Sequence, residues 1–270
     1  MSDERVAAAR RSFELAASGY DAPELDFFRR ISETVVDRLD VAREARVLDV
    51  PCGTGHATRH VLRRLGPDGR VSGLDLSGKM LAVAATKVGS DARVELREAD
   101  MRSMPFEDGA FDEVLSVFGI FFLPDMVPGM VELWRLVAPG GRLTVVTWKP
   151  NFFGSVRDVF MQRIHELRPD LVPVAVKDHR RLAATPDDLR RLGRAASINS
   201  EPVFSEVLCA QTIPEPSSWW RTELGAARRG IIESLTPQER DDVRVAGEDH
   251  LRDQGITSLP CDALVTTFRR

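Results

Sequence analysis

Residues 47–55 read Val-Leu-Asp-Val-Pro-Cys-Gly-Thr-Gly, and this stretch decides the fold class. A short apolar run carries Asp49 and leads into a turn at Gly53 and Gly55, and residues 56–65 that follow have a helical pattern. Glycine has no Cβ, so a strand, turn and helix of this kind let the backbone approach a ligand closely. The stretch therefore predicts the ligand-binding turn of a nucleotide-binding α/β fold.

The acid distinguishes this turn from an ordinary dinucleotide loop. A carboxylate at Asp49 would repel a pyrophosphate, whereas it would favour a ligand that carries ammonium and sulfonium charges. The third glycine of a dinucleotide fingerprint would fall at position 58, which is Thr58. Both observations argue against an NAD-dependent oxidoreductase, which is the least favoured of the functions considered below.

Strand-like and helical patterns alternate between residues 46 and 148. We expect strands at 46–50, 70–75, 92–97, 111–117 and 142–148, with helices at 55–65, 77–88 and 124–137, the last stopped by Pro139-Gly140-Gly141. This alternation predicts a parallel sheet covered on both faces. Helices at 3–17 and 23–40 precede it. After Pro150 we expect a helix at 154–167, a helix start at Thr185, a strand-like stretch at 201–213, mainly helical structure at 215–254 and a last strand at 262–268.

The overall composition narrows the class of protein. Among 270 residues, 37 are basic and 41 acidic, and the net charge of −4 lacks the basic footprint of a nucleic-acid binder. The sequence shows no signal-peptide pattern and no apolar run of membrane-spanning length. Cys52, Cys209 and Cys261 are far apart, which favours reduced thiols over a disulfide framework or a metal cluster. We therefore expect a cytoplasmic protein with a small-molecule substrate, no nucleic-acid partner, no membrane insertion and no metal, and leave a homodimer open.

Three acids follow three successive strands. Asp49 ends the first, Asp75 ends the second and Asp100 follows the third. In an open α/β sheet ligands bind beyond the carboxyl ends of the strands, so these acids should meet in one crevice. Asp75 lies 20 residues after Gly55, the spacing at which a carboxylate accepts hydrogen bonds from ribose hydroxyls. Asp100 could accept from the amine of an adenine ring that packs on Leu76 and Met101. A nucleoside with a cationic tail and no phosphate fits all three acids.

Five segments in order resemble the successive motifs of class I S-adenosylmethionine-dependent methyltransferases. They read VLDVPCGTG (47–55), GLDLSGKML (73–81), ADMRSMPF (99–106), FDEVLSVF (111–118) and LVAPGGRL (136–143). Within that family the sequence looks most like the small-molecule enzymes similar to ubiquinone and menaquinone C-methyltransferases. The resemblance implies a Rossmann-like, doubly wound α/β fold with seven strands, mostly parallel, and an antiparallel last strand.

The resemblance also implies a domain plan and a cofactor site. One structural domain would consist of an N-terminal helical cover (1–40), the core that binds S-adenosylmethionine (41–150) and a segment (151–270) that completes the sheet and inserts helices on the substrate side. Pro51 stands where the family more often has glycine, and losing an N–H there is tolerable because the ammonium of the cofactor needs acceptors. The implied cofactor-binding residues are Tyr20, Asp49, Pro51, Cys52, Gly53, Gly55, Asp75, Leu76, Met80, Asp100, Met101, Val117 and Phe118.

The predicted function is methyl transfer from S-adenosylmethionine, with S-adenosylhomocysteine as product, to the O or C atom of a small apolar or aromatic metabolite. An enzyme that keeps this cofactor site but catalyses a rearrangement or cyclisation is the alternative. His56, beside the glycine turn, is a candidate base without a visible partner. Phe121, Phe122, Trp219 and Trp220 are candidate substrate contacts, and burial in the core is the competing interpretation for each.

Overall fold

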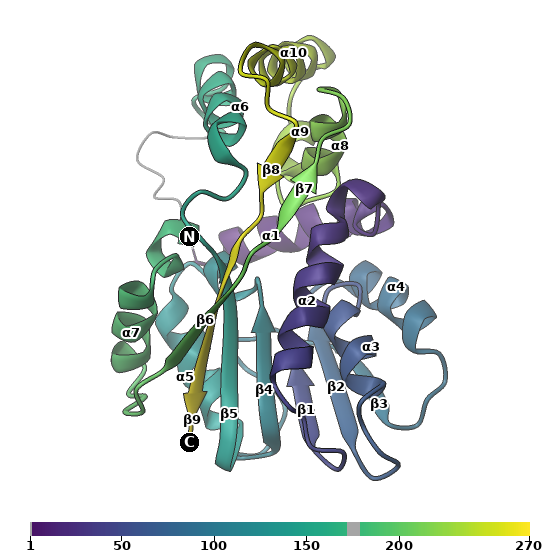
Figure 1. Cartoon of the computed structure of the whole chain (residues 1–270), viewed down its shortest axis with the longest axis vertical. Coiled ribbons are helices and arrows are strands. Elements are labelled where there is room, and N and C mark those ends of the chain that lie inside the picture. The colour runs from purple at the N-terminus through teal and green to yellow at the C-terminus, as the bar shows by residue number, and fades with distance from the viewer. Residues whose placement is uncertain (1, 172–178) are drawn as a thin grey trace.

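A seven-stranded sheet forms the centre of the protein (Figure 1), which is described here from a computed structural model that covers residues 2–171 and 179–270. Its strand order is β3-β2-β1-β4-β5-β9-β6. The first five strands pair in parallel, and β9 lies antiparallel between β5 and β6. This arrangement confirms the predicted fold class. The strands are β1 (Arg46–Asp49), β2 (Arg70–Asp75), β3 (Val94–Glu98), β4 (Phe111–Val117), β5 (Val137–Trp148), β6 (Val203–Val207) and β9 (Ala263–Arg269).

Helices flank the sheet on both sides. α2, α3 and α4 lie together on one flank and α5 with α7 on the other, while α1 crosses above the carboxyl ends of the parallel strands (Figure 1). α2 buries Phe27, Ile31 and Val35 at helical spacing, and each such side chain contributes about 1.5–3 kcal/mol when it leaves water. The bounds are α1 (Ser2–Ala16), α2 (Asp26–Arg38), α3 (His56–Leu62), α4 (Gly78–Val88), α5 (Met126–Arg135) and α7 (Pro186–Ala195), with short 3₁₀ turns η1 (Ala17–Gly19), η2 (Pro23–Leu25), η3 (Ile120–Phe122) and η4 (His179–Ala183).

A smaller unit stands above the same end of the sheet. It consists of a two-stranded antiparallel ribbon and four helices (Figure 1). The ribbon is β7 (Ala210–Thr212) with β8 (Ser258–Pro260), and the helices are α6 (Gly154–Leu167), α8 (Ser218–Leu224), α9 (Arg229–Glu233) and α10 (Pro237–Asp253). The ribbon brings Cys209 opposite Cys261, whose amide donates to the Cys209 carbonyl over 2.8 Å. All three cysteines are buried free thiols, and no cluster of potential metal ligands occurs among the described residues.

Several predicted bounds are wrong for local reasons. The predicted strand at 201–213 divides between two sheets as β6 and β7. Pro139-Gly140-Gly141, which is expected to stop a helix, lies inside β5 instead, and this strand begins at Val137. The strand accommodates these residues because its register with β4 shifts between Phe111 and Glu113. Gly141 is needed there, since a Cβ would lie 2.7 Å from the Asp112 carbonyl. No helix within residues 2–171 and 179–270 has the length and apolarity needed to cross a membrane.

Candidate active site

A cavity with about 1010 Å³ of open space lies beyond the carboxyl ends of β1, β2 and β4. We call it the large cavity. Gly55 is the one predicted cofactor-binding residue outside its wall; its φ of +81° and the closeness of Ala84, 3.0 Å from an added Cβ, give it a purely conformational role. The other predicted residues all line the cavity: Tyr20, Asp49, Pro51, Cys52, Gly53, Asp75, Leu76, Met80, Asp100, Met101, Val117 and Phe118.

Asp49 is a buried acid with one unused oxygen. β1 ends at this residue, and its side chain is 1% exposed. The Thr58 hydroxyl donates to Oδ2 over 2.6 Å, while Oδ1 has no hydrogen-bond partner among the described residues. Burial raises the pKa of Asp49 to about 7. An unpartnered buried carboxylate oxygen is costly unless a ligand satisfies it, so the site suits a hydrogen-bond donor or a cation.

Asp75 fixes the glycine turn to β2. Its Oδ2 accepts from the Gly53 amide over 2.8 Å and its Oδ1 from the Ser77 amide over 2.9 Å. Burial raises the pKa of Asp75 to about 6, against these hydrogen bonds. Each carboxylate oxygen has two acceptor positions, so Asp75 keeps capacity for two hydroxyl donors from a ligand.

Asp100 differs from the other two acids because it is ion-paired. Arg102 binds it through the backbone amide and the guanidinium, with Nη2 2.6 Å from Oδ2. Partial burial opposes ionisation of Asp100, but the hydrogen bonds from Arg102 outweigh it and keep the pKa below its ordinary value. The large cavity therefore has less negative charge than the three acids suggested, and Arg102 is a partner that the sequence analysis missed.

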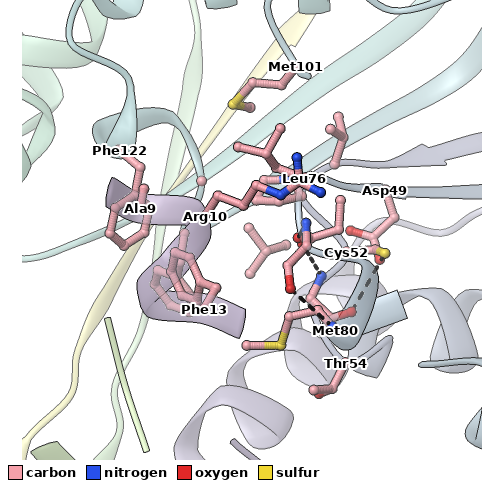
Figure 2. Close-up of a pocket in the computed structure, with 18 of the residues that line it drawn as sticks. Ala9, Arg10, Phe13, Asp49, Cys52, Thr54, Leu76, Met80, Met101 and Phe122 are labelled. Carbon is pink, nitrogen blue, oxygen red and sulfur yellow. Dashed lines mark hydrogen bonds between the residues drawn. The ribbon is translucent and has the colours of Figure 1, made fainter. Parts of the chain in front are cut away.

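Helix α1 supplies a wall that the sequence analysis also missed. Val6, Ala9 and Phe13 line the large cavity together with Arg10, which forms an ion pair with Glu98 at the end of β3. Figure 2 shows Ala9, Arg10 and Phe13 on one side of the cavity, with Asp49 and Cys52 on the other. The apolar residues are spaced three and four apart, the signature of one helix face. That spacing could have assigned α1 to a buried position, although not to this cavity.

His56 has a partner, Asp21, from the short segment between η1 and η2. His56 Nε2 lies 2.9 Å from the Asp21 carboxylate, which also binds the Thr54 hydroxyl at 2.7 Å and Lys87 at 2.7 Å. Burial opposes the ionisation of Asp21, but hydrogen bonds from His56, Lys87 and Thr54 outweigh it and lower its pKa. The other nitrogen of His56, Nδ1, is buried and has no partner in the described part of the chain. His56 lines the large cavity, so its role as a base stays a prediction, and Asp21 is the partner that the sequence did not reveal.

A second, smaller cavity, with about 450 Å³ of space that includes its opening to solvent, adjoins the first, and we call it the aromatic cavity. Phe13, Tyr20, Phe28, Phe118 and Phe122 line both cavities, so their rings form a common wall. A stack runs along the aromatic cavity, with 3.6 Å between the ring centroids of Phe118 and Trp148 and 4.0 Å from Trp148 to Phe152. The remaining lining residues are Phe27, Phe121, Phe153, Arg180, Ala226, Ala227 and Arg228.

The four candidate substrate contacts separate into two pairs. Phe121 and Phe122 line the aromatic cavity, and their contact with substrate stays a prediction. Trp219 and Trp220, in contrast, line neither cavity within the described chain. Trp219 is 1% exposed and packs so closely on α10 that a Cβ on Gly247 would lie 2.0 Å from its ring. Trp219 therefore has a packing role in the upper unit, and contact of the pair with substrate stays a prediction without support from either cavity.

Comparisons with known proteins agree with this geometry. Residues 47–141 match a family described as a methyltransferase domain. The chain is 37% identical over 158 residues to a demethylmenaquinone methyltransferase of Thermus thermophilus, covering 53% of this chain and 70% of that protein. This chain belongs to the class I S-adenosylmethionine-dependent methyltransferases. Enzymes of the same name from two Bacillus species match over 53% and 54% of their length.

Solved structures show the same methyltransferase fold across most of the chain. The YcgJ protein of Bacillus subtilis superposes with a TM-score of 0.59 at 17% identity, covering 89% of this chain and 98% of that one. The [4+2]-cyclase SpnF superposes with a TM-score of 0.52 at 20% identity, covering 89% of this chain and 80% of that one. At these identities the likeness concerns the fold, which a cyclase shares. The cofactor of this methyltransferase family is S-adenosylmethionine.

Proposed function

We propose that this methyltransferase transfers a methyl group to a small apolar metabolite that carries an aromatic or quinonoid ring. The observation that carries the proposal is the common wall of five aromatic side chains between the large cavity and the aromatic cavity. Ligands in the two cavities would contact the same set of rings and could meet where the cavities adjoin. Flat apolar rings are what such stacked aromatic walls bind best.

The large cavity has the groups that S-adenosylmethionine requires. The unused Oδ1 of Asp49 offers an acceptor to the cationic end, and Asp75 offers acceptor positions to the ribose hydroxyls. Leu76 and Met101 provide apolar surface for adenine beside Asp100. The bound cofactor supplies a methyl group already activated by the sulfonium. The other predicted cofactor-binding residues in the wall would complete this cavity: Tyr20, Pro51, Cys52, Gly53, Met80, Val117 and Phe118.

The protein's own part is alignment and exclusion of water. Helix α1 and the five-ring common wall leave apolar surface around the point where the two cavities meet. Holding acceptor and donor in contact replaces a bimolecular encounter, and a dry surrounding removes competing hydrolysis. Methylation of a ring carbon releases one proton, because the new C–C bond replaces a C–H bond, and His56, which lines the large cavity and contacts Asp21, is the candidate base that takes it.

The relatives suggest which ring to test first. Their name gives demethylmenaquinone as the substrate, and we propose a reduced naphthoquinone ring or a compound like it as the acceptor here, with a ring carbon as the methylated atom. Incubation with S-adenosylmethionine and 1,4-dihydroxynaphthalene under reducing conditions should give S-adenosylhomocysteine and a product one methyl heavier by mass spectrometry. Asp75→Ala serves as the cofactor-deficient control. Product formation without S-adenosylhomocysteine would favour the cyclisation or rearrangement class, and binding of neither cofactor form would refute the proposal.

The proposal also covers the cellular location, the partners and the domain plan of the protein. We propose a cytoplasmic enzyme that binds no nucleic acid and that forms a homodimer, with residues 1–40 and 151–270 serving as covers of the 41–150 core. Sedimentation of the protein with and without S-adenosylhomocysteine tests the dimer. Cell fractionation tests the location, and a gel-shift assay with duplex and single-stranded DNA tests the nucleic-acid statement.

A further inference from the structure

The aromatic cavity contains a buried ion pair that the proposed function does not yet use. Arg228, at the start of α9, lines the cavity and is 7% exposed, and its partner Glu223 is 1% exposed. The guanidinium carbon lies 5.6 Å from the ring centroid of Phe153 and 5.5 Å from that of Phe160. A charged group thus forms part of an otherwise largely apolar surface.

The donors of Arg228 are only partly engaged. Nε and Nη2 form a two-point contact with both oxygens of Glu223, with Nη2 2.5 Å from Oε1. Nη1 makes no hydrogen bond to any residue in the described ranges, and this atom is accessible to solvent. A guanidinium has five N–H donors in a fixed plane, so Nη1 keeps two donors for a ligand.

Burial of such a pair is hard to explain by stability alone. Replacing a buried ion pair by apolar side chains of similar volume is often neutral or stabilising, because the charges no longer have to leave water. Glu223 neutralises the guanidinium, and the pair as a whole therefore suits a hydrogen-bond-accepting oxygen better than a highly charged anion. Ring-conjugated oxygens, such as those of phenols, hydroquinones and quinones, have this chemistry and the flat shape that the stacked rings bind.

We propose that Arg228 is a specificity-determining residue that binds an oxygen atom attached to the ring of the methyl acceptor. The inference rests on the proposed function and deepens it. Arg228 lines the aromatic cavity but not the large cavity, whereas the five-ring common wall lines both. The oxygen held by Arg228 is therefore directed away from the methyl donor, and the methylated atom is a different one, on the side of the ring that faces the common wall.

A binding experiment separates this inference from catalysis. Calorimetry with the S-adenosylhomocysteine complex measures the affinity for 1-naphthol and for naphthalene, which differ by one hydroxyl group. We expect wild-type protein to prefer 1-naphthol about tenfold, as one hydrogen bond to a charged donor allows. The double variant Glu223→Gln/Arg228→Met should reduce this preference to about twofold or less while its affinity for naphthalene stays unchanged. Arg228→Lys, which keeps the charge without the planar fork, should give an intermediate preference.

A second ion pair, in which the glutamate is buried and the arginine partly buried, provides the matched control. Arg142 binds Glu113 at the opposite end of the sheet, with Nε 2.7 Å from Oε1, and neither residue lines the aromatic cavity in the described structure. Glu113→Gln/Arg142→Met should keep the full preference for 1-naphthol, and melting curves verify that both double variants fold. A preference that survives in Glu223→Gln/Arg228→Met, or that is absent from wild type with S-adenosylhomocysteine bound, overturns the inference. Failure of wild type to bind S-adenosylhomocysteine would instead refute the proposed function.

Discussion

The two cavities differ in how the chain builds them. The large cavity takes its polar groups from the ends of neighbouring parallel strands, and Asp49, Asp75 and Asp100 follow one another along the sequence. The aromatic cavity takes its rings mainly from α1, α2, η3, β5 and the segment between β5 and α6, and its buried arginine from the segment before α9. The hydrogen-bonded sheet positions the large cavity, because this cavity lies at strand ends. The position of the aromatic cavity depends instead on how distant segments pack. We expect the first to bind the common cofactor and the second to determine what the enzyme methylates.

The largest loss of affinity should come from substituting Asp75, which tests whether the large cavity binds the cofactor independently of the aromatic cavity. Asp75→Ala removes the acceptor proposed for the ribose and leaves the Gly53 and Ser77 amides unpaired. We expect affinity for S-adenosylhomocysteine to fall about a hundredfold, measured by calorimetry, because a two-point contact and the turn geometry are lost together. Asp112→Ala, which breaks a surface pair with Arg46, is the control and should bind normally. Normal binding by Asp75→Ala would contradict the assignment.

A substitution of Trp148 tests whether the aromatic cavity binds the acceptor independently of the cofactor site. Trp148→Leu removes stacking against Phe118 and Phe152, contacts worth about 0.5–1.5 kcal/mol each beyond the buried area. Affinity for 1-naphthol should fall about tenfold, while affinity for S-adenosylhomocysteine stays within about twofold. Trp134→Leu, on α5 and away from both cavities, should change neither. Equal losses for both ligands would show that the two cavities act as a single site.

The pH dependence of cofactor binding sharpens the contrast, since Asp49 and Asp75, the acids whose pKa burial raises to about 7 and about 6, line the large cavity and not the aromatic cavity. Burial raises the pKa of Asp49 to about 7 from an ordinary value of about 4. Between these values the folded protein holds a proton that the unfolded chain has lost, so Asp49 makes the free energy of unfolding fall as pH rises through that window. A cationic ligand favours the ionised form. Stabilisation by S-adenosylmethionine should therefore grow from about pH 5 to about pH 8.

Asp49→Asn should remove part of this pH dependence. We expect the ligand-free variant to melt at a higher temperature than wild type at about pH 8, because no buried charge forms. Its affinity for S-adenosylmethionine should fall about tenfold. Melting curves with and without the ligand measure both effects. A wild-type-like pH profile in Asp49→Asn would assign the titration to another group, of which Asp75, with a pKa of about 6, is the first to examine.

The smallest effect on binding is expected at Trp219. Trp219→Phe leaves space beside Gly247 in the upper unit and should lower the free energy of unfolding by about 1–3 kcal/mol. Affinities for S-adenosylhomocysteine and for 1-naphthol should stay within about twofold of wild type. A selective loss of 1-naphthol binding would return Trp219 to the acceptor site.

The sequence could reveal the large cavity because its chemistry is local. A strand, a turn and an acid occur within a few residues, and parallel pairing then brings successive acids to one edge. Asp21, Arg102 and Arg228 were not identified because their importance depends on partners. Asp21 acquires its role from Thr54, His56 and Lys87, which only the docking of the N-terminal cover brings near. Arg228 stands next to Arg229, a pattern typical of a solvated helix face, and only the packing of distant segments buries it beside Phe153 and Phe160.

The common wall has a thermodynamic consequence. Two ligands that rest against Phe13, Tyr20, Phe28, Phe118 and Phe122 restrict the motions of the same side chains. Once one ligand has ordered these rings, the other loses less conformational entropy when it binds, which is positive cooperativity without any change of shape. By linkage the factor is reciprocal: whatever S-adenosylhomocysteine adds to the affinity for the acceptor, the acceptor adds to the affinity for S-adenosylhomocysteine.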